Sequence, residues 1–300
     1  MNQRRNRNIR ARRRHGRRGY ILIVTLFIIA MVGILTVGLA RHSMNMAISA
    51  VNSESDLQTR WGTASCQRFA IENQQELLSE QIWNEQTNSW VAHPVARSTC
   101  EFNFGKQLYL VRLDDESSKL SLNHAIANGS RQKVTGLVRK FARNNLAVAL
   151  RPLDDTKSRG PTEQPFESWG QVFTSTGSTA ISPDLIRDGS EELTCWSRQL
   201  NFATASDEVL YEATKLLVGG SIARQITDLR EKQPELNLEA TLRQTNATEV
   251  QVGDLRNLLT NRSRTQSVWV TANSPTSTRD TLTIREEFTD TLSRLHSFTW

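Results

Sequence analysis

The sequence predicts an α+β fold in which a long N-terminal helix packs on an antiparallel sheet that carries a helical insertion. Three observations predict it. An uncharged apolar run follows an arginine-rich segment near the start of the chain. Apolar residues then keep helical spacing for several more turns. Beyond that helix the apolar period changes to two, first near residue 100 and again near residue 270.

The apolar run from Tyr20 to Ala40 is long enough to cross a membrane. At about 1.5 Å per residue it reaches about 31 Å, which matches a hydrocarbon thickness of about 30 Å. Many arginines precede the run and only Arg41 follows it closely. The positive-inside bias therefore predicts a single pass of the inner membrane, with the N-terminus in the cytoplasm and the body outside. The preceding arginines are Arg4, Arg5, Arg7, Arg10, Arg12, Arg13, Arg14, Arg17 and Arg18.

The helix is expected to continue past the membrane. Between Arg41 and Trp83 there is no proline and only one glycine, Gly62. Helical spacing persists in two apolar sets, Met44, Ala47, Ile48 and Val51, and then Leu57, Trp61 and Ala64. The sequence thus predicts a basic leader over 1–19 and one helix over 20–85, with its first part transmembrane.

Beyond the helix, alternating runs predict strands over 99–104 and 107–113, joined by the turn Gly105-Lys106, and a third run over 119–123. Runs at 267–272 and 281–285 are expected to complete the same sheet. The predicted sheet domain is therefore 86–124 together with 262–290, and residues 125–261 form a helical insertion. Within the insertion, 151–192 is rich in proline and glycine and predicts a long loop region.

Two segments of the insertion have clear helical patterns. Ser130 is a candidate cap for a helix with Val134, Leu137, Val138 and Phe141 on one face. A helical hairpin follows, with Ser206 capping its first helix, Gly219-Gly220 at the break and Ser221 capping its second helix. This hairpin has two interpretations, a structural element or a helix-hairpin-helix module that binds DNA phosphates. Its adjacent glycines with no following lysine favour the structural one.

The chain's net charge of +6 comes from the leader, because 28 basic and 31 acidic residues follow residue 19. A nucleic-acid footprint needs basic residues on the folded surface, so no nucleic-acid partner is expected. The five histidines are scattered, and no phosphate loop, His-Glu-x-x-His or Gly-x-Ser-x-Gly motif occurs. We expect no enzymatic activity and no cofactor.

Two further groups of residues have alternative interpretations. The carboxylates Asp114, Asp115 and Glu116 suit either a calcium site or, as their irregular spacing favours, a solvated turn. Cys66, Cys100 and Cys195 show no metal-ligand spacing. Either one disulfide forms, with Cys100–Cys195 preferred, or all three are unpaired thiols.

Two motifs resemble the minor pseudopilin K family of the type II (general) secretion pathway. Asp115-Glu116-Ser117-Ser118-Lys119-Leu120-Ser121-Leu122-Asn123 is similar to the family's DE-x-x-K-L-N-L-N run. Leu200-Asn201-Phe202-Ala203-Thr204-Ala205-Ser206-Asp207-Glu208-Val209-Leu210 is similar to its L-N-V-N-T-A-S-x-x-V-L run. Gly19 before the apolar helix and the strand Ser267-Val268-Trp269-Val270 complete the resemblance. The family's tryptophan- and aspartate-rich stretch is missing, so calcium binding is not carried over.

The resemblance implies a pilin-like fold, cleavage after Gly19 by prepilin peptidase and methylation of Tyr20 as the new N-terminus. It also implies assembly through the long helix at the tip of a short periplasmic pseudopilus. The implied partners are other minor pseudopilins and the inner-membrane platform of the secretion system. Most pilins carry a glutamate at the fifth mature position, and here that position is Val24. The K family shares this feature, which suits a subunit with no neighbour above it.

The residues expected to carry assembly are Val24, Leu26, Ile29, Met44, Ile48 and Val51. An alternative function is a single-pass, membrane-anchored periplasmic protein of a related type IV pilus or DNA-uptake system. In that case the helical hairpin would contact DNA.

Overall fold

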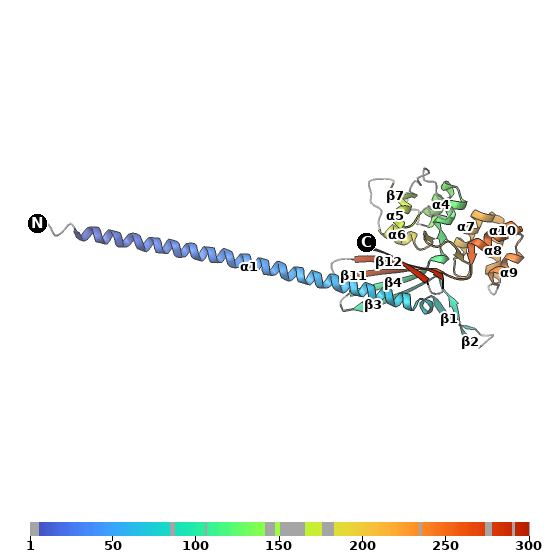
Figure 1. The fold of residues 1–300 in the computed structure, drawn as a ribbon, viewed down its shortest axis with the longest axis horizontal. Helices are drawn as coiled ribbons and strands as arrows, with labels where there is room; N and C mark the ends of the chain where they lie inside the picture. Colours follow the sequence, from blue (N-terminus) through green and yellow to red (C-terminus); the bar gives the residue numbers. More distant parts are fainter. Residues whose placement is uncertain are drawn as a thin grey trace. The chain divides into compact units, whose positions relative to one another are not determined.

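The computed structural model describes residues 6–84, 88–105, 107–141, 148–150, 166–175, 183–233, 236–273, 278–289 and 292–299. The chain divides into two units, Met1–Trp61 and Gly62–Trp300. Helix α1 (Asn6–Glu72) supplies the described part of the first unit and its last turns belong to the second (Figure 1). One helix among the described residues is long and apolar enough, by length and composition, to cross a membrane, and it is Tyr20–Glu72 of α1.

Helix α1 ends at Glu72 instead of near residue 85, so the predicted helix is too long. Asn73 leaves helical geometry, with φ −107° and ψ 18°, and its side-chain amide donates back to the Phe69 carbonyl at 2.8 Å. No proline or glycine lies at this end of the helix, so nothing in the sequence indicated it and the predicted helix is too long. Ile82 and Trp83 have strong strand preference and lie in a strand instead.

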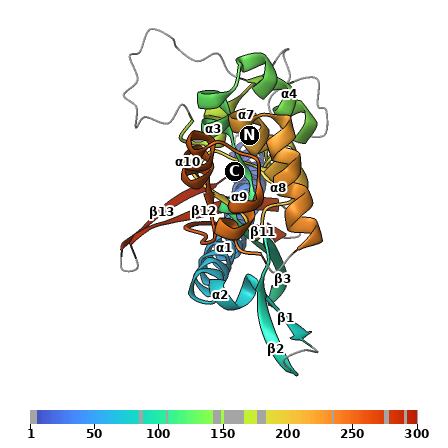
Figure 2. The same ribbon diagram turned by 90° about the vertical axis from the view of Figure 1, so that its right-hand side faces the viewer.

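The segment after α1 forms a short helix and a separate hairpin. Helix α2 (Gln74–Leu77) leads into β1 (Ser79–Asn84), which pairs antiparallel with β2 (Ser89–Pro94). Trp83 and Trp90 are paired across this hairpin, with ring centroids 5.5 Å apart. The hairpin extends away from the main sheet (Figure 2).

The main sheet has five antiparallel strands in the order β13-β12-β11-β4-β3. Their bounds are β3 Arg97–Phe104, β4 Gln107–Asp115, β11 Thr265–Asn273, β12 Thr278–Thr289 and β13 Leu292–Thr299. The prediction that the late strands complete the sheet begun near residue 99 is confirmed, and so is the α+β class. The sheet also continues past the predicted limit of 290, because β13 adds an edge strand.

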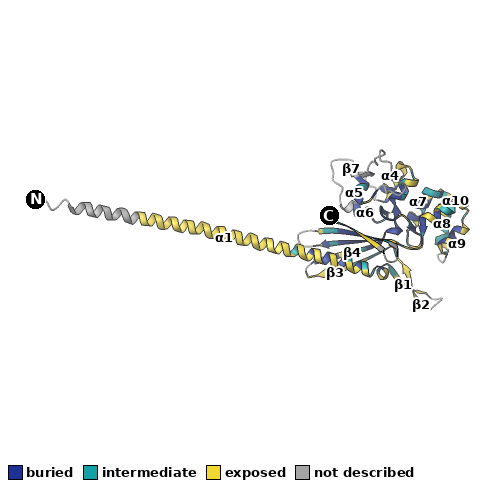
Figure 3. Cartoon of the chain, in the orientation of Figure 1, coloured by how far each residue is buried: buried dark blue, intermediate teal, exposed yellow. Residues whose placement is uncertain are grey.

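Each face of the sheet is covered by a different part of the second unit. On one face Val268, Val270 and Ala272 pack in a core with Cys66 and Ala70 from the last turns of α1. On the other face Trp269, Leu282 and Ile284 pack into the larger core of the helical insertion. The sheet is thus the middle of three layers, and Figure 3 shows it buried along its central strands.

The insertion is built from short helices joined by two-stranded pairs. Its helices are α3 Leu122–Asn128, α4 Arg131–Phe141, α5 Trp169–Val172, α6 Pro183–Gly189, α7 Asp207–Val218, α8 Gly220–Lys232, α9 Leu238–Gln244 and α10 Glu249–Leu258. Its strands are β5 Leu120–Ser121, β6 Val148–Leu150, β7 Phe173–Ser175, β8 Leu193–Thr194, β9 Leu200–Asn201 and β10 Leu259–Thr260. Parallel pairs β5–β8 and β9–β10 connect distant segments of the insertion.

Several helix predictions are confirmed and others are corrected. The predicted face of α4, Val134, Leu137, Val138 and Phe141, is buried, and Ser206 caps α7 by accepting from the Val209 amide. Helix α8 begins directly after Gly219, so Ser221 is not its cap. Gly219 has φ +86°, a conformation that a side chain disfavours, and this allows the sharp turn between the helices.

Two predicted loop or strand segments also differ. The run at 119–123 is a strand only at Leu120–Ser121 and then becomes α3. In the section predicted as loop, 151–165 and 176–182 lie outside the described residues. The rest contains α5, β7 and α6, and the aromatic side chains Phe166, Trp169 and Phe173 are buried in the insertion core.

Gly62 is required by a close approach within the second unit. A Cβ at this position would lie 2.2 Å from the Tyr109 hydroxyl oxygen. The Tyr109 ring is fully buried, and its hydroxyl donates to Gln107 Oε1 at 2.5 Å, so moving the ring would disturb both its packing and this hydrogen bond. Gly62→Ala is therefore expected to destabilise the fold by about 1 to 3 kcal/mol through overpacking. Chemical unfolding followed by circular dichroism measures this.

The matched control is Gly253→Ala in α10, where nothing lies within 4 Å of the added Cβ. Helix propensity then acts alone, and a gain of up to about 1 kcal/mol is expected. If both variants change the free energy of unfolding by the same amount, the close approach of Gly62 to Tyr109 does not affect stability.

Candidate functional site: an exposed apolar helix surface and a buried charge cluster

The first candidate site is the apolar surface of α1 within the first unit. All six residues expected to carry assembly are exposed, from Val24 at 37 % to Ile29 at 71 %. Figure 3 shows this part of α1 exposed along its length. Gly19 and Tyr20, the predicted processing position, lie on consecutive positions of the helix, and the Tyr20 side chain is 70 % exposed.

Two kinds of apolar surface follow one another along α1. From Tyr20 to Ala40 the side chains are apolar on all sides, which suits lipid or a surrounding bundle of helices. Beyond Arg41, Met44, Ile48 and Val51 fall on one side of the helix and remain exposed. A contiguous exposed apolar surface of this kind marks a membrane or protein interaction site.

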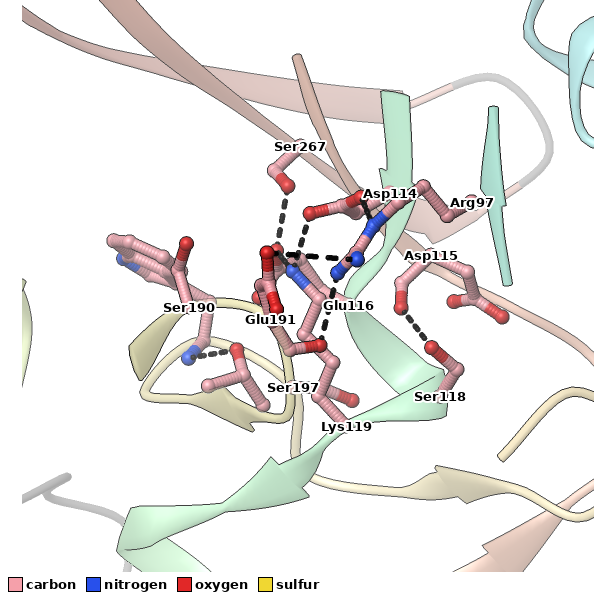
Figure 4. Close-up of polar contacts among 12 residues, drawn as sticks. Arg97, Asp114, Asp115, Glu116, Ser118, Lys119, Ser190, Glu191, Ser197 and Ser267 are labelled. Atoms are coloured by element: carbon pink, nitrogen blue, oxygen red, sulfur yellow. Dashed lines mark hydrogen bonds and ion pairs between the residues drawn. The ribbon is translucent and has the colours of Figure 1, made fainter. Parts of the chain in front are cut away.

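The second candidate site is a cluster of charged side chains buried between the sheet and the insertion (Figure 4). Asp114, Asp115, Glu116 and Lys119 are each no more than 2 % exposed. The interpretation of this segment as a solvated turn is wrong. Burying several charges requires pairing, so their partners determine what the cluster does.

Asp114 is the centre of the cluster. Its carboxylate accepts from Arg97 Nε at 2.7 Å and from Lys119 Nζ at 2.8 Å, and Arg112 Nε lies 3.1 Å from it. Arg97 and Arg112 come from adjacent strands of the sheet, β3 and β4. The strand register places Asp114 beside Arg97 and beside Ser267 of β11.

The same cations hold the insertion. Arg97 donates from Nη2 to the Glu191 carbonyl at 3.1 Å, and Arg112 donates from Nη2 to the Ser190 hydroxyl at 2.8 Å. The Arg112 guanidinium also lies 5.1 Å from the Trp269 ring centroid. Two sheet arginines therefore share one carboxylate and contact the segment that follows α6.

Glu116 and Lys119 complete the cluster. Lys119 Nζ donates to Glu116 Oε1 at 2.6 Å, and the Ser267 hydroxyl donates to the same oxygen at 2.5 Å. Burial alone would raise the pKa of Asp114, but attraction to Lys119, Arg112 and Arg97 outweighs it and lowers that pKa. Asp114 is thus held as a carboxylate.

Asp115 points to a second set of partners. It accepts from the Ser117 amide at 2.8 Å, from Asn201 Nδ2 at 3.2 Å and from Thr204 Oγ1 at 2.8 Å, and it also accepts from Ser263 Oγ. Burial raises the pKa of Asp115, and these hydrogen bonds only partly oppose the rise. Among the described residues, the donors around this second carboxylate are neutral and no cation pairs with it.

These contacts bring together the two sequence runs that carried the resemblance. Asp115 belongs to the first run, and Asn201 and Thr204 belong to the second. The sequence did not indicate that they meet, nor that Arg97, Arg112 and Ser267 are partners of the cluster. The two arginines lie in strand segments, and nothing in the sequence around them indicates an ion pair. The signal available was Lys119 three residues after Glu116, a spacing at which opposite charges pair in a turn.

The cluster is built to position segments, because protein donors engage both oxygens of Asp114, both oxygens of Asp115 and Oε1 of Glu116, while Glu116 Oε2 is buried without a hydrogen-bond partner. Among the described residues no group of three or more His, Cys, Asp or Glu side chains could hold a metal ion. Across the α7–α8 turn, the Gly219 amide donates to the Lys215 carbonyl at 3.2 Å and so caps its own helix.

The preferred disulfide Cys100–Cys195 is wrong. All three cysteines are free thiols in this structure. Cys195 lies in the insertion core, whereas Cys100 packs with Cys66 in the core under α1, on the other face of the sheet. The sheet separates the two thiols of the preferred disulfide.

A long N-terminal helix whose last turns pack on an antiparallel sheet is the architecture of pilin-like proteins, and the chain has a pseudopilin-like fold. It is similar to a chain of the GspK-GspI-GspJ complex from the enterotoxigenic Escherichia coli type 2 secretion system. The TM-score is 0.50 at 14 % identity, over 83 % of this chain and 98 % of that chain. No protein family model matches the chain, and no curated protein sequence matches it.

The charge cluster makes a prediction about stability and pH. Asp114→Asn removes the anion shared by the buried Lys119 and the partly buried Arg97 and Arg112, and breaking a buried ion pair costs about 3 to 5 kcal/mol. Because the folded pKa of Asp114 is lowered below 3.8, its contribution is complete above that pH and is lost as pH falls through the lowered value. Unfolding at pH 7 should show the full penalty, and the difference from wild type should shrink below pH 3.8.

The control is Glu239→Gln, which removes an exposed ion pair with Arg256 on the insertion surface. Exposed pairs are screened by solvent, so little change in unfolding is expected at either pH. A constant difference between Asp114→Asn and wild type from pH 7 to pH 3 would contradict the charged role of Asp114.

Proposed function

We propose that the chain is a minor pseudopilin of a type II secretion system, assembled at the tip of the periplasmic pseudopilus for protein secretion. The observation that carries the proposal is the exposed apolar surface of α1, attached to a body of pseudopilin-like fold. A subunit of this design is complete only when other helices or lipid cover that surface. The chain acts as a non-enzymatic assembly subunit.

The topology follows from the charge pattern. The arginine-rich leader stays in the cytoplasm, Tyr20 to Ala40 crosses the inner membrane and the body lies in the periplasm. Prepilin peptidase removes the leader after Gly19. The partners of the mature chain are other minor pseudopilins and the inner-membrane platform, by analogy with a solved structure that is itself a complex of three such proteins.

Val24 supports a place at the tip. A carboxylate in the middle of a membrane costs roughly 2.5 to 3.5 kcal/mol unless it is paired. A subunit with another subunit above it can pair such a carboxylate with the neighbour's terminal amine. A tip subunit has no such neighbour, and an apolar residue at this position avoids the cost.

The first test is processing. Co-expression with a prepilin peptidase should yield a mature chain whose intact mass begins at Tyr20, and Gly19→Lys should leave the chain uncut. Gly16→Ala, a glycine substitution within the same leader, serves as the control and should be processed normally. A wild-type chain that keeps its leader would support an ordinary single-pass anchored protein instead.

The second test is assembly. Ile48→Asp places a charge within the set Met44, Ile48 and Val51 and should reduce recovery of companion pseudopilins by at least tenfold in a pull-down from detergent. Ala50 lies about 200° further round the helix and is also exposed, so Ala50→Asp should retain the partners. Equal loss by both variants would point to a general effect of charge on α1 instead of a specific face.

A further inference from the structure

Two thiols from different elements share one small core. Cys66, on the last turns of α1, is 1 % exposed, and Cys100, on the edge strand β3, is partly buried. Both pack in the core formed with Tyr109, Val111 and Val270. Neither residue is used by the charge cluster or by the exposed surface of α1.

The register of helix against strand brings the two thiols together. Phe69 lies three residues after Cys66, Phe102 lies two residues after Cys100, and their ring centroids are 5.1 Å apart. Three helical residues advance about 4.5 Å and two strand residues about 6.7 Å, so the two spacings differ by only about 2 Å and both thiols lie in the same part of this core.

The sheet pairing turns Cys100 toward the helix. Cys100 is paired with Val111 and Phe102 with Tyr109, and the side chains of cross-strand partners point to the same face. The Tyr109 ring in turn lies against Gly62, one turn before Cys66 on α1. The face of β3 that carries Cys100 is therefore the face covered by α1.

The electrostatics agree with this placement. Burial raises the pKa of the Cys66 thiol to about 11, and the nearby Cys100 adds to the rise. Burial thus favours uncharged sulfur at both positions, and a disulfide carries no charge and meets this condition.

We propose that Cys66 and Cys100 form the single disulfide of the mature protein, and that Cys195 remains a thiol. The inference rests on the proposed function, which puts the body in an oxidising compartment. Cys195 is fully enclosed in the insertion core and has no second cysteine in that core.

The reaction needs an oxidant that is itself a disulfide. The more accessible Cys100 thiolate attacks a disulfide such as oxidised glutathione, and one glutathione thiolate leaves. The Cys66 thiolate then attacks the mixed disulfide at the Cys100 sulfur and displaces the second glutathione. Two protons and two electrons leave the protein, and the oxidant is reduced to two thiols.

The bond would fix the last turns of α1 to β3. It would close the loop that contains α2 and the β1–β2 hairpin, and closing a loop stabilises a fold by restricting the unfolded chain. In a filament, neighbouring subunits would hold the helix while the body projects outward. The disulfide would then keep the last turns of α1 packed on the sheet.

The test uses the full chain in detergent, oxidised with glutathione disulfide and then alkylated after denaturation. We expect a mass lower by two hydrogens before alkylation, and one alkyl group after it where the reduced chain takes three. Trypsin should release peptides 61–68 and 98–106 linked to each other, and peptide 188–198 alkylated at Cys195. Cys100→Ser should abolish the link, and Cys195→Ser should leave it intact.

A refolding arm covers the case in which the folded protein excludes the oxidant. The chain is unfolded in urea and refolded in a buffer of reduced and oxidised glutathione before the same peptide mapping. Three alkylated cysteines in both arms, or a link to Cys195 in either arm, would overturn the proposal. Processing at Gly19 is measured separately, so a correctly processed chain without the disulfide rejects this inference alone. An unprocessed chain with the disulfide rejects only the proposed function.

Discussion

The body of the protein depends on one buried carboxylate. Asp114 pairs with three cations, Arg97 and Arg112 from the sheet and Lys119 from the turn that follows β4. The two arginines also donate hydrogen bonds to the segment after α6. Without this anion the three cations would lose their shared partner, and Lys119 would keep only Glu116 in a buried site, at a cost far above that of an ordinary surface contact. The cluster thus determines where the insertion sits on the sheet, and the apolar core around Trp269 supplies most of the burial energy.

The neighbouring carboxylate shows how position changes the role of a side chain. Asp114 is surrounded by cations and its pKa falls, whereas Asp115 is surrounded by neutral donors and its pKa rises. The second carboxylate joins β4 to the start of the α7 region through Asn201 and Thr204. Asp115 thus connects segments nearly ninety positions apart in the chain, and these contacts join the two short runs of sequence that carry the resemblance.

Elements with strong local periodicity could be predicted from the sequence. The helix through residue 72, the sheet completed from both ends of the body and the hairpin capped by Ser206 all have apolar spacing or turn residues that point to one structure.

The end of α1 could not be predicted, because Asn73 breaks the helix without proline or glycine and the pairing of Trp83 with Trp90 places the following residues in a hairpin. The charge cluster was missed because acidic residues beside a turn are normally solvated, and only the layer above the sheet makes them buried. The preferred Cys100–Cys195 disulfide was wrong because the sequence does not say which face of the sheet each thiol occupies.

Covering the sheet on both faces limits how this body can meet another protein. The last turns of α1 occupy one face and the insertion occupies the other, so a partner cannot stack on the sheet itself. What the sheet still offers is its two edges, β3 and β13, whose outward backbone groups have no strand beside them among the described residues. A neighbouring subunit that approaches the body could therefore extend the sheet by pairing a strand along an edge, a geometry that fixes direction and register through the backbone alone. The insertion then has a second consequence besides adding surface, because it restricts the sheet to lateral growth.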